Sequence, residues 1–157
     1  MKVLVLNNNR KENEMLMNKF KEMYYDVPIF EVEKIAKDQF TRNREVDEQN
    51  KIFYDIISSN PNWVFVGFPE TSLDFIASSS SSIIVMDYAV QIVKRRFSFL
   101  SLLQRTPTNL GDLDIPSIYT SDFLKEFYKK YARNIIIIKK RKDFKALINA
   151  LDKHMDL

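Results

Sequence analysis

The chain has 157 residues, 45% of them hydrophobic and 13% aromatic, which predicts one globular domain with a sizeable core. The absence of cysteine excludes a disulfide framework and cysteine-based zinc or iron sites, and a single histidine argues against any transition-metal site. No apolar stretch approaches the roughly 18 residues needed to span a bilayer, and no signal-peptide pattern is present. We therefore expect a cytoplasmic protein without a membrane partner.

The net charge of +3 is unevenly divided along the chain. Residues 1–78 carry 10 Lys and Arg against 13 Asp and Glu, whereas residues 79–157 carry 14 against 8. Such asymmetry is compatible with a face that binds a polyanion, and equally with lysines and arginines that only solvate helices.

In the first half of the chain, apolar runs alternate with amphipathic helical patterns. Met1–Leu6 lacks polar alternation, which predicts a buried strand. The polar loop Asn7–Glu14 then leads to a helix whose apolar face is Leu16, Phe20, Met23 and Tyr24. The elements expected next are a strand at Ile29–Val32, an irregular polar segment at 33–45, a helix from Val46 to the breaker Ser58–Pro61, and a strand at Trp63–Val66.

The second half continues this alternation. We expect, in order, a short helix or turn at Thr71–Ala77, a surface loop in the serine run Ser78–Ser82, a strand at Ile83–Met86, a basic helix at about Ala89–Arg105, an irregular excursion at Thr106–Thr120, a helix capped by Ser121, a strand at Ile135–Ile138, and a last helix containing Phe144, Leu147, Ile148 and Leu151. Strands that alternate with helices predict an α/β fold: a five-stranded, mostly parallel sheet with helices on both faces.

This layout resembles the P-loop nucleoside and nucleotide kinases, especially the small adenylate-kinase-related proteins known as topology modulation proteins. The resemblance covers nearly the full length and rests on Met1–Leu6, Val27–Ile29, Asn62–Val64 with Gly67, Ile83–Asp87, Gln104–Pro107 and Ile135–Ile138. It implies a single three-layer α/β/α domain spanning residues 1–157, with a lid-like helical excursion at about 88–133. A flavodoxin-like or response-regulator-like sheet is the competing fold.

The family's phosphate loop, G-x-x-x-x-G-K-[ST], is degenerate in this chain. Its two glycines fall on Asn7 and Glu12, its lysine on Asn13 and its hydroxyl residue on Glu14. Glycines let backbone amides approach a phosphate, and a lysine offsets the phosphate charge, so this loop lacks both contributions. Arg10 or Lys11 could compensate only in part.

Other positions of the family pattern are mixed. The acid usual near the end of the third strand is replaced by Val66, whereas Glu33 stands where the family commonly has an aspartate after the second strand. The remaining candidate ligand-binding residues are Lys94, Arg95, Arg96 and Arg105, which equally fit a solvated basic helix face. We predict no catalytic residue and no metal ligand. Asp87 is interpreted as a strand-end residue and His154 as an exposed one.

The leading hypothesis is therefore a non-catalytic relative of P-loop kinases that has lost ATP-phosphate binding and acts through a protein partner, a second copy or, weakly, a nucleic acid. It implies no cofactor. The alternative is a nucleotide or nucleoside kinase-like phosphotransferase that binds ATP with Mg²⁺ through a non-standard loop.

Overall fold

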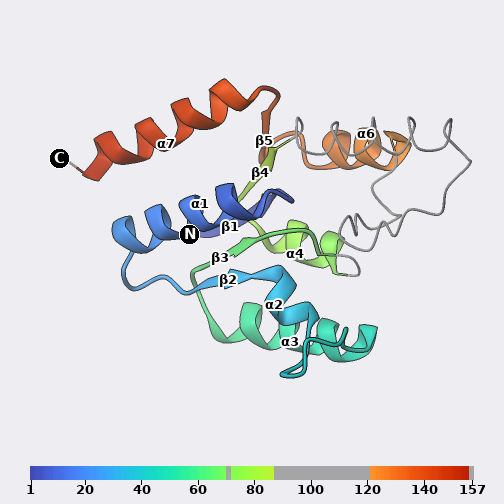
Figure 1. The fold of residues 1–157 in the computed structure, drawn as a ribbon. Helices are drawn as coiled ribbons and strands as arrows, with labels where there is room; N and C mark the ends of the chain where they lie inside the picture. Colours follow the sequence, from blue (N-terminus) through green and yellow to red (C-terminus); the bar gives the residue numbers. More distant parts are fainter. Residues whose placement is uncertain (70–71, 87–120, 156–157) are drawn as a thin grey trace, which may run out of the picture.

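A computed structural model of the chain describes residues 1–69, 72–86 and 121–155. Five strands form one sheet in the order β2-β3-β1-β4-β5, and every neighbouring pair is parallel (Figure 1). The strands are β1 (Lys2–Leu6), β2 (Ile29–Glu31), β3 (Trp63–Val66), β4 (Ser82–Met86) and β5 (Ile135–Ile138). The predicted α/β class and all five predicted strands are confirmed.

The strand order separates this sheet from the competing fold. Flavodoxin-like and response-regulator-like proteins order their strands 2-1-3-4-5, with the second strand beside the first. Here β3 lies between β1 and β2, and Lys2 to Val5 of β1 align with Trp63 to Val66 of β3. The flavodoxin-like alternative is therefore wrong for this chain.

Helices cover both faces of the sheet, which gives the three layers visible in Figure 1. One face carries α1 (Arg10–Met23) and α7 (Arg141–Met155), which pack against one another. The opposite face carries α2 (Val32–Ala36), α3 (Val46–Ser59), α4 (Leu73–Ser79) and α6 (Ser121–Lys130). Parallel strands need crossover connections, and all of these helices except α7, which follows the last strand, lie in such connections.

The core is densest around the central strands because both of their faces are covered. Trp63, Phe65 and Phe53 are almost fully buried, and the Phe65 ring lies 4.9 Å from that of Trp63 and 5.4 Å from that of Phe53. Full burial of one such side chain contributes roughly 1.5–3 kcal/mol. The edge strand β5 differs, since Ile136 is 53% exposed despite the run of four isoleucines.

Two segments expected to be irregular lie partly in helices or strands. The polar stretch 33–45 begins inside α2, which starts at Val32, directly after β2 ends at Glu31. The serine run is not a surface loop: Ser78 and Ser79 end α4, and Ser82 begins β4. Ser80, between them, is buried and donates its hydroxyl to the Ile76 carbonyl at 2.7 Å. A hydroxyl that bonds the preceding helical turn lets serine end a helix without a loop.

The predicted lid-like excursion is described only in part. Its residues 88–120, the predicted helix at Ala89–Arg105 and Asp87 lie outside the described residues, as does the side chain of His154. Residues 121–130 form α6, which buries Leu124 and Phe127 against the sheet, and Tyr131 directly after α6 is buried with them. In the described residues, no helix is both long and apolar enough to cross a membrane.

Candidate functional site

The carboxyl ends of all five strands meet at one edge of the sheet, where α/β proteins of this kind bind their ligands. From the centre of the sheet, β1 leads into α1 on one face. Its neighbour β3 leads into α4 on the opposite face. Connections that leave adjacent strands toward opposite faces open a crevice between them. The residues after β1, β2 and β3 are therefore the first place to look for a site.

The connection after β1 is much shorter than predicted. Only Asn7, Asn8 and Asn9 separate Leu6 from the first residue of α1, Arg10. The expected loop Asn7–Glu14 is therefore wrong in its extent: Arg10, Lys11, Glu12, Asn13 and Glu14 all lie in the opening turns of α1. Asn9 is the N-cap, and its side-chain oxygen accepts the amide of Glu12 at 3.2 Å. This cap begins the helix early, because it satisfies an amide that otherwise lacks a partner.

Three of the predicted phosphate-loop residues form a buried polar cluster. Asn7 is 0% exposed, Glu12 is 3% exposed and Asn13 is 5% exposed. Asn7 donates its amide Nδ2 to Glu12 Oε2 at 3.2 Å, and Asn13 Nδ2 donates to the Asn7 carbonyl at 3.0 Å. Asn7 Oδ1 accepts the backbone amide of Asn9, also at 3.2 Å. These side chains thus hydrogen-bond one another and the backbone at the start of α1, while the buried Asn13 Oδ1 has no hydrogen-bond partner among the described residues.

The buried carboxylate of this cluster is paired with a cation from the last helix. Arg141, the first residue of α7, places its Nε 3.3 Å from Glu12 Oε1. The Glu12 side chain is 4% exposed, whereas that of Arg141 is 71% exposed, so the pair has one buried and one solvated member. A carboxylate at the first turn of a helix also interacts favourably with the helix dipole. Glu12 thus supplies from within the chain the negative charge that a helix N-terminus attracts.

The remaining predicted phosphate-loop residues point to solvent. Arg10 and Glu14 are exposed and pair with one another, with 3.2 Å between Nε and Oε1. Lys11 is exposed as well. The structure therefore divides the six positions into a buried trio, Asn7, Glu12 and Asn13, and an exposed trio, Arg10, Lys11 and Glu14.

Glu33 lies at the same edge of the sheet, after β2. Its Oε1 accepts the backbone amide of Phe68 at 3.1 Å, just beyond the end of β3. Its Oε2 is buried and has no hydrogen-bond partner among the described residues. Burial raises the pKa of the Glu33 carboxyl above its ordinary value, and the bond from the Phe68 amide opposes that shift. A buried acid with a raised pKa and a spare oxygen is the feature here most typical of a ligand-binding group.

Gly67 makes room for this carboxylate. A Cβ at position 67 would lie 2.4 Å from Glu33 Oε2 and 2.6 Å from Oε1, and Gly67 has a φ of +133°. Both the close approach and the positive φ require glycine. The sequence analysis identified Gly67 and Glu33 separately, and the structure joins them across 34 residues of chain.

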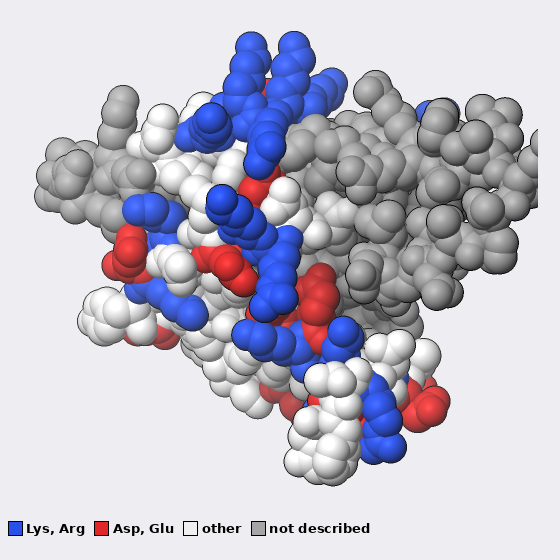
Figure 2. Space-filling view, viewed as in Figure 1, with Lys and Arg blue, Asp and Glu red and all other residues white. Residues whose placement is uncertain are grey.

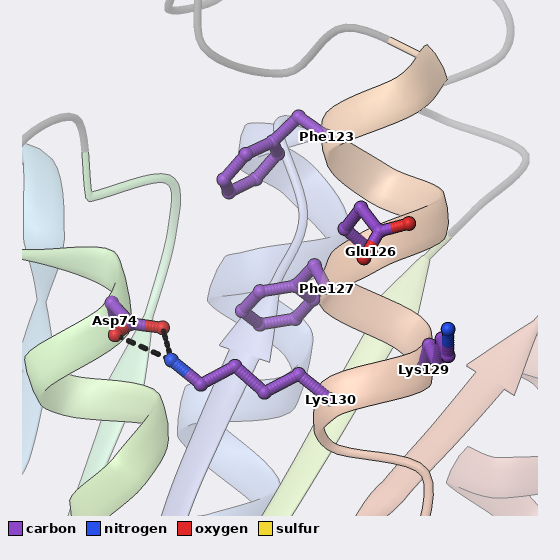
Figure 3. Close-up of a pocket in the computed structure, with 6 residues that line it drawn as sticks. All are labelled: Asp74, Phe123, Glu126, Phe127, Lys129 and Lys130. Carbon is purple, nitrogen blue, oxygen red and sulfur yellow. Dashed lines mark hydrogen bonds and ion pairs between the residues drawn. The ribbon is translucent and has the colours of Figure 1, made fainter.

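A separate cavity of about 490 Å³ lies between α4 and α6 (Figure 3). Phe123 and Phe127 point into it from α6, with their rings 5.9 Å apart. Lys130 reaches across to Asp74, with its Nζ 2.7 Å from each carboxylate oxygen. The Tyr131 hydroxyl donates to Asp74 Oδ1 at 2.6 Å.

Three of the polar side chains beside this cavity, Asp74, Lys130 and Tyr131, are linked by hydrogen bonds. The hydrogen bond from Lys130, helped by that from Tyr131, lowers the pKa of Asp74. Burial and the neighbouring Asp74 raise the pKa of Tyr131, which makes its hydroxyl a weaker acid and keeps it protonated as a hydrogen-bond donor. Asp74 and its two partners therefore join α4 to α6 as a structural clamp. No sequence signal marked it, since Asp74 lies 56 and 57 residues from Lys130 and Tyr131.

Other predicted site residues have a simpler outcome. Val66, where the kinases resembled keep an acid, is 0% exposed and packs with Val5 in the core on the α1 side of the sheet. Lys94, Arg95, Arg96 and Arg105 lie outside the described residues. Arg141 was not predicted as a site residue; it belongs to the basic run Lys139–Lys142, but its partner Glu12 could not be read from the sequence. Within the described residues, no three His, Cys, Asp or Glu side chains gather as they would around a metal ion.

Comparisons with known proteins add little beyond the fold. Neither the models of known protein families nor the curated proteins give a match to this chain. Among solved structures, shikimate kinase from Bacteroides thetaiotaomicron is similar over 99% of this chain and 98% of its own length, with 11% sequence identity and a TM-score of 0.42. A likeness of this size carries no conclusion about what this chain binds or does.

Proposed function

We propose that this chain is a non-catalytic binding protein with a P-loop-kinase-like fold, which has lost ATP-phosphate binding and acts through a protein or nucleic-acid partner. The observation that carries the proposal is the buried cluster of Asn7, Glu12 and Asn13 at the start of α1. The kinase-like part rests on the resemblance seen in the sequence, and the parallel sheet with β3 between β1 and β2 is compatible with it.

The cluster opposes phosphate binding in two ways. A phosphate loop works because several backbone amides are free to point at the anion. Here the amide of Glu12 is held by the Asn9 side chain and that of Asn9 by the Asn7 side chain. In addition, the Glu12 carboxylate would repel the phosphate. Two like unit charges about 4 Å apart repel by about 4 kcal/mol at an effective dielectric constant of about 20.

The short length of the β1–α1 connection also argues against phosphate binding. The phosphate-loop motif runs over eight residues and wraps the anion before its helix is established. Here three residues connect β1 to α1, and the helix already contains the positions of the motif's second glycine and lysine. A phosphate would have to unwind the first turns of α1 to find a cradle of amides.

A second function, a kinase-like phosphotransferase with a non-standard site, is favoured by one observation only. Glu33 keeps a buried oxygen without a hydrogen-bond partner at the ligand-binding edge of the sheet. Such an oxygen is suited to accept a hydrogen bond from a hydroxyl group of a small molecule. In that case Glu33 would orient the acceptor, and the phosphate donor would be held by residues other than those of the β1–α1 connection.

Thermal unfolding with nucleotides tests the proposal directly. A ligand at about 100 times its Kd stabilises a protein by about 2.7 kcal/mol, which raises the Tm of a domain of this size by roughly 5–10 °C. We expect no rise with millimolar ATP or GTP and Mg²⁺. A rise of several degrees would contradict the proposal.

A matched pair of variants then identifies the site. If a rise is seen and Glu33→Ala abolishes it, whereas Glu14→Ala at an exposed acid does not, the second function takes the place of the first. A rise that survives both variants would place the nucleotide elsewhere on the chain.

A further inference from the structure

Among the residues that the structure describes, eight exposed cations lie along the carboxyl edge of the sheet. They come from the three segments that follow β5, β1 and β2, and they are Lys139, Lys140, Arg141, Lys142, Arg10, Lys11, Lys34 and Lys37. We call them the basic stripe. Figure 2 shows Lys and Arg gathered in a band that runs from the start of α7, across the start of α1, toward α2.

Contacts join the three parts of the stripe. Arg141 of α7 pairs with Glu12 of α1, which brings the start of α7 against the start of α1. Helix α1 also contacts β2, which leads directly into α2. The stripe is therefore one continuous surface, although the residues of α7 are more than a hundred positions from the others in sequence.

The acids within the same segments reduce this charge only in part. With the acids that directly adjoin these cations included, they are Glu12, Glu14, Glu31, Glu33, Asp38 and Asp143, six against eight cations. Glu12 is buried, and the Glu33 carboxylate is turned inward against Gly67 and Phe68. Only Glu14 has a side chain more than half exposed, whereas that of Glu31 is 19% exposed. The outer surface of the stripe is thus strongly positive.

The spacing between the three groups of cations follows from the strand order. In the order β2-β3-β1-β4-β5, the strands that lead into the stripe are every second one. Neighbouring strands are about 4.8 Å apart, so the three groups of cations are spaced by about 10 Å and extend over about 19 Å. One strand of B-form DNA advances about 3.4 Å per residue along its axis, so this length matches about five or six phosphates.

We infer that the basic stripe binds the sugar-phosphate backbone of a nucleic acid, without reading its sequence. A line of exposed cations recognises a line of phosphates through counterion release, which needs no base contact. The inference rests on the proposed function in one respect: the start of α1 is filled from within the chain, so Arg10 and Lys11 face outward rather than around a nucleotide. Within the proposed function, it names the partner as a nucleic acid.

Fluorescence anisotropy with a labelled 20-base-pair duplex of random sequence tests the inference on the full chain. About five phosphate contacts predict that log Kobs falls with log[salt] with a slope of roughly −4 to −5. We expect a second duplex of different sequence to give the same slope. The absence of binding at 20 mM salt, or a slope shallower than about −2, would overturn the inference.

Paired variants locate the surface. Arg10→Ala with Lys11→Ala removes two cations of the stripe and should make the slope less steep by about 1.8, at about 0.9 per phosphate. Lys21→Ala with Lys51→Ala removes the same charge from the far end of α1 and from α3, and should leave the slope unchanged. Lys139→Ala with Lys142→Ala provides an independent variant at the other end of the stripe that spares Arg141. Equal effects of the stripe and control variants would overturn the inference.

Two further experiments distinguish nucleic-acid binding from binding to a membrane surface or to a nucleotide. Tighter binding to anionic phospholipid vesicles than to the duplex at equal salt would overturn it in favour of a membrane surface. Millimolar ATP should weaken duplex binding only as much as its ionic strength does. A thermal shift with ATP alongside intact duplex binding would refute the proposed function and leave the stripe standing, whereas absent duplex binding without any nucleotide shift would refute the stripe alone.

Discussion

Replacing Gly67 with alanine tests the contact that holds the candidate ligand-binding acid in place. The new Cβ would lie 2.4 Å and 2.6 Å from the two carboxylate oxygens of Glu33, far inside van der Waals contact. Glu33 would have to swing away and lose the bond from the Phe68 amide, which costs about 1 kcal/mol. The φ of +133° costs a residue with a side chain a further 1–3 kcal/mol or so. We therefore expect Gly67→Ala to destabilise the protein by about 2–4 kcal/mol.

Urea unfolding followed by tryptophan fluorescence measures this effect, because the chain has one tryptophan, Trp63, and it is fully buried. At a slope of about 2 kcal/mol per molar urea, the midpoint should fall by roughly 1–2 M.

The variant Glu33→Ala and the double variant complete a cycle that separates clash from backbone strain. With the carboxylate gone, Gly67→Ala should cost about 1 kcal/mol less than it does in the wild type, and the φ strain should remain. A Gly67→Ala protein within 0.5 kcal/mol of wild type, or a double variant equal to the sum of the singles, would refute the packing of Glu33 on Gly67.

Three other predictions concern the charged groups. Since burial raises the pKa of Glu33 in the folded state, the folded protein keeps this proton to higher pH than the unfolded chain, so stability falls as pH rises above the ordinary pKa of 4.5. The urea midpoint of Glu33→Gln should therefore improve relative to that of the wild type between pH 4 and pH 7. A constant difference between the two midpoints would contradict this. Arg141→Ala should lower the free energy of unfolding by about 1 kcal/mol, because it leaves the Glu12 carboxylate buried beside fewer partners. Lys142→Ala, which removes an exposed neighbouring cation, should be close to neutral. Equal urea midpoints for the two variants would mean that the Arg141–Glu12 pair does not contribute to stability. Tyr131→Phe should lower stability by about 1 kcal/mol by removing the hydroxyl that bonds Asp74. Relative to the wild type, hydrogen exchange should show that α6 loses more protection than the sheet does. Unchanged exchange in α6 would argue against the clamp.

The sheet could be predicted from the sequence because each strand is a short apolar run bounded by breakers. Val3–Leu6 and Ile135–Ile138 need no tertiary information to be recognised, and the alternation with helices makes a parallel sheet almost the only solution. The strand order was not predicted, since nothing local to β3 says that it inserts between β1 and β2. It follows from which helices pack on which face, and that is a property of the assembled core.

The errors in local structure have a common cause, which is that polar residues were taken for loops. Glu33 and Lys34 lie in a short helix, Ser78 and Ser79 end a helix, Ser82 begins a strand, and Arg10–Glu14 lie in α1. In each case a specific hydrogen bond or burial decides: Asn9 caps α1, Ser80 bonds the Ile76 carbonyl, and Val32 is buried at the start of α2. Composition predicts exposure on average, but a helix end is set by one donor and one acceptor.

The candidate site shows what a degenerate motif does and does not reveal. The absence of glycine and lysine at the positions of Asn7, Glu12 and Asn13 is the basis for our proposal that phosphate binding is lost, because a phosphate cradle requires those residue types. What replaced that chemistry depends on a partner far away in sequence, since Arg141 reaches Glu12 only when α7 packs beside α1. The physics at the start of the helix is the same in both cases, since a helix N-terminus is stabilised by negative charge whether that charge belongs to a phosphate or to a carboxylate. In this chain the carboxylate belongs to Glu12, so it is always present at the helix N-terminus and does not depend on the concentration of a ligand. The cations beside it, Arg10 and Lys11, are exposed. In our proposal, the edge of the sheet at which the Glu12 carboxylate opposes a small phosphate therefore offers a long positive surface to a larger polyanion.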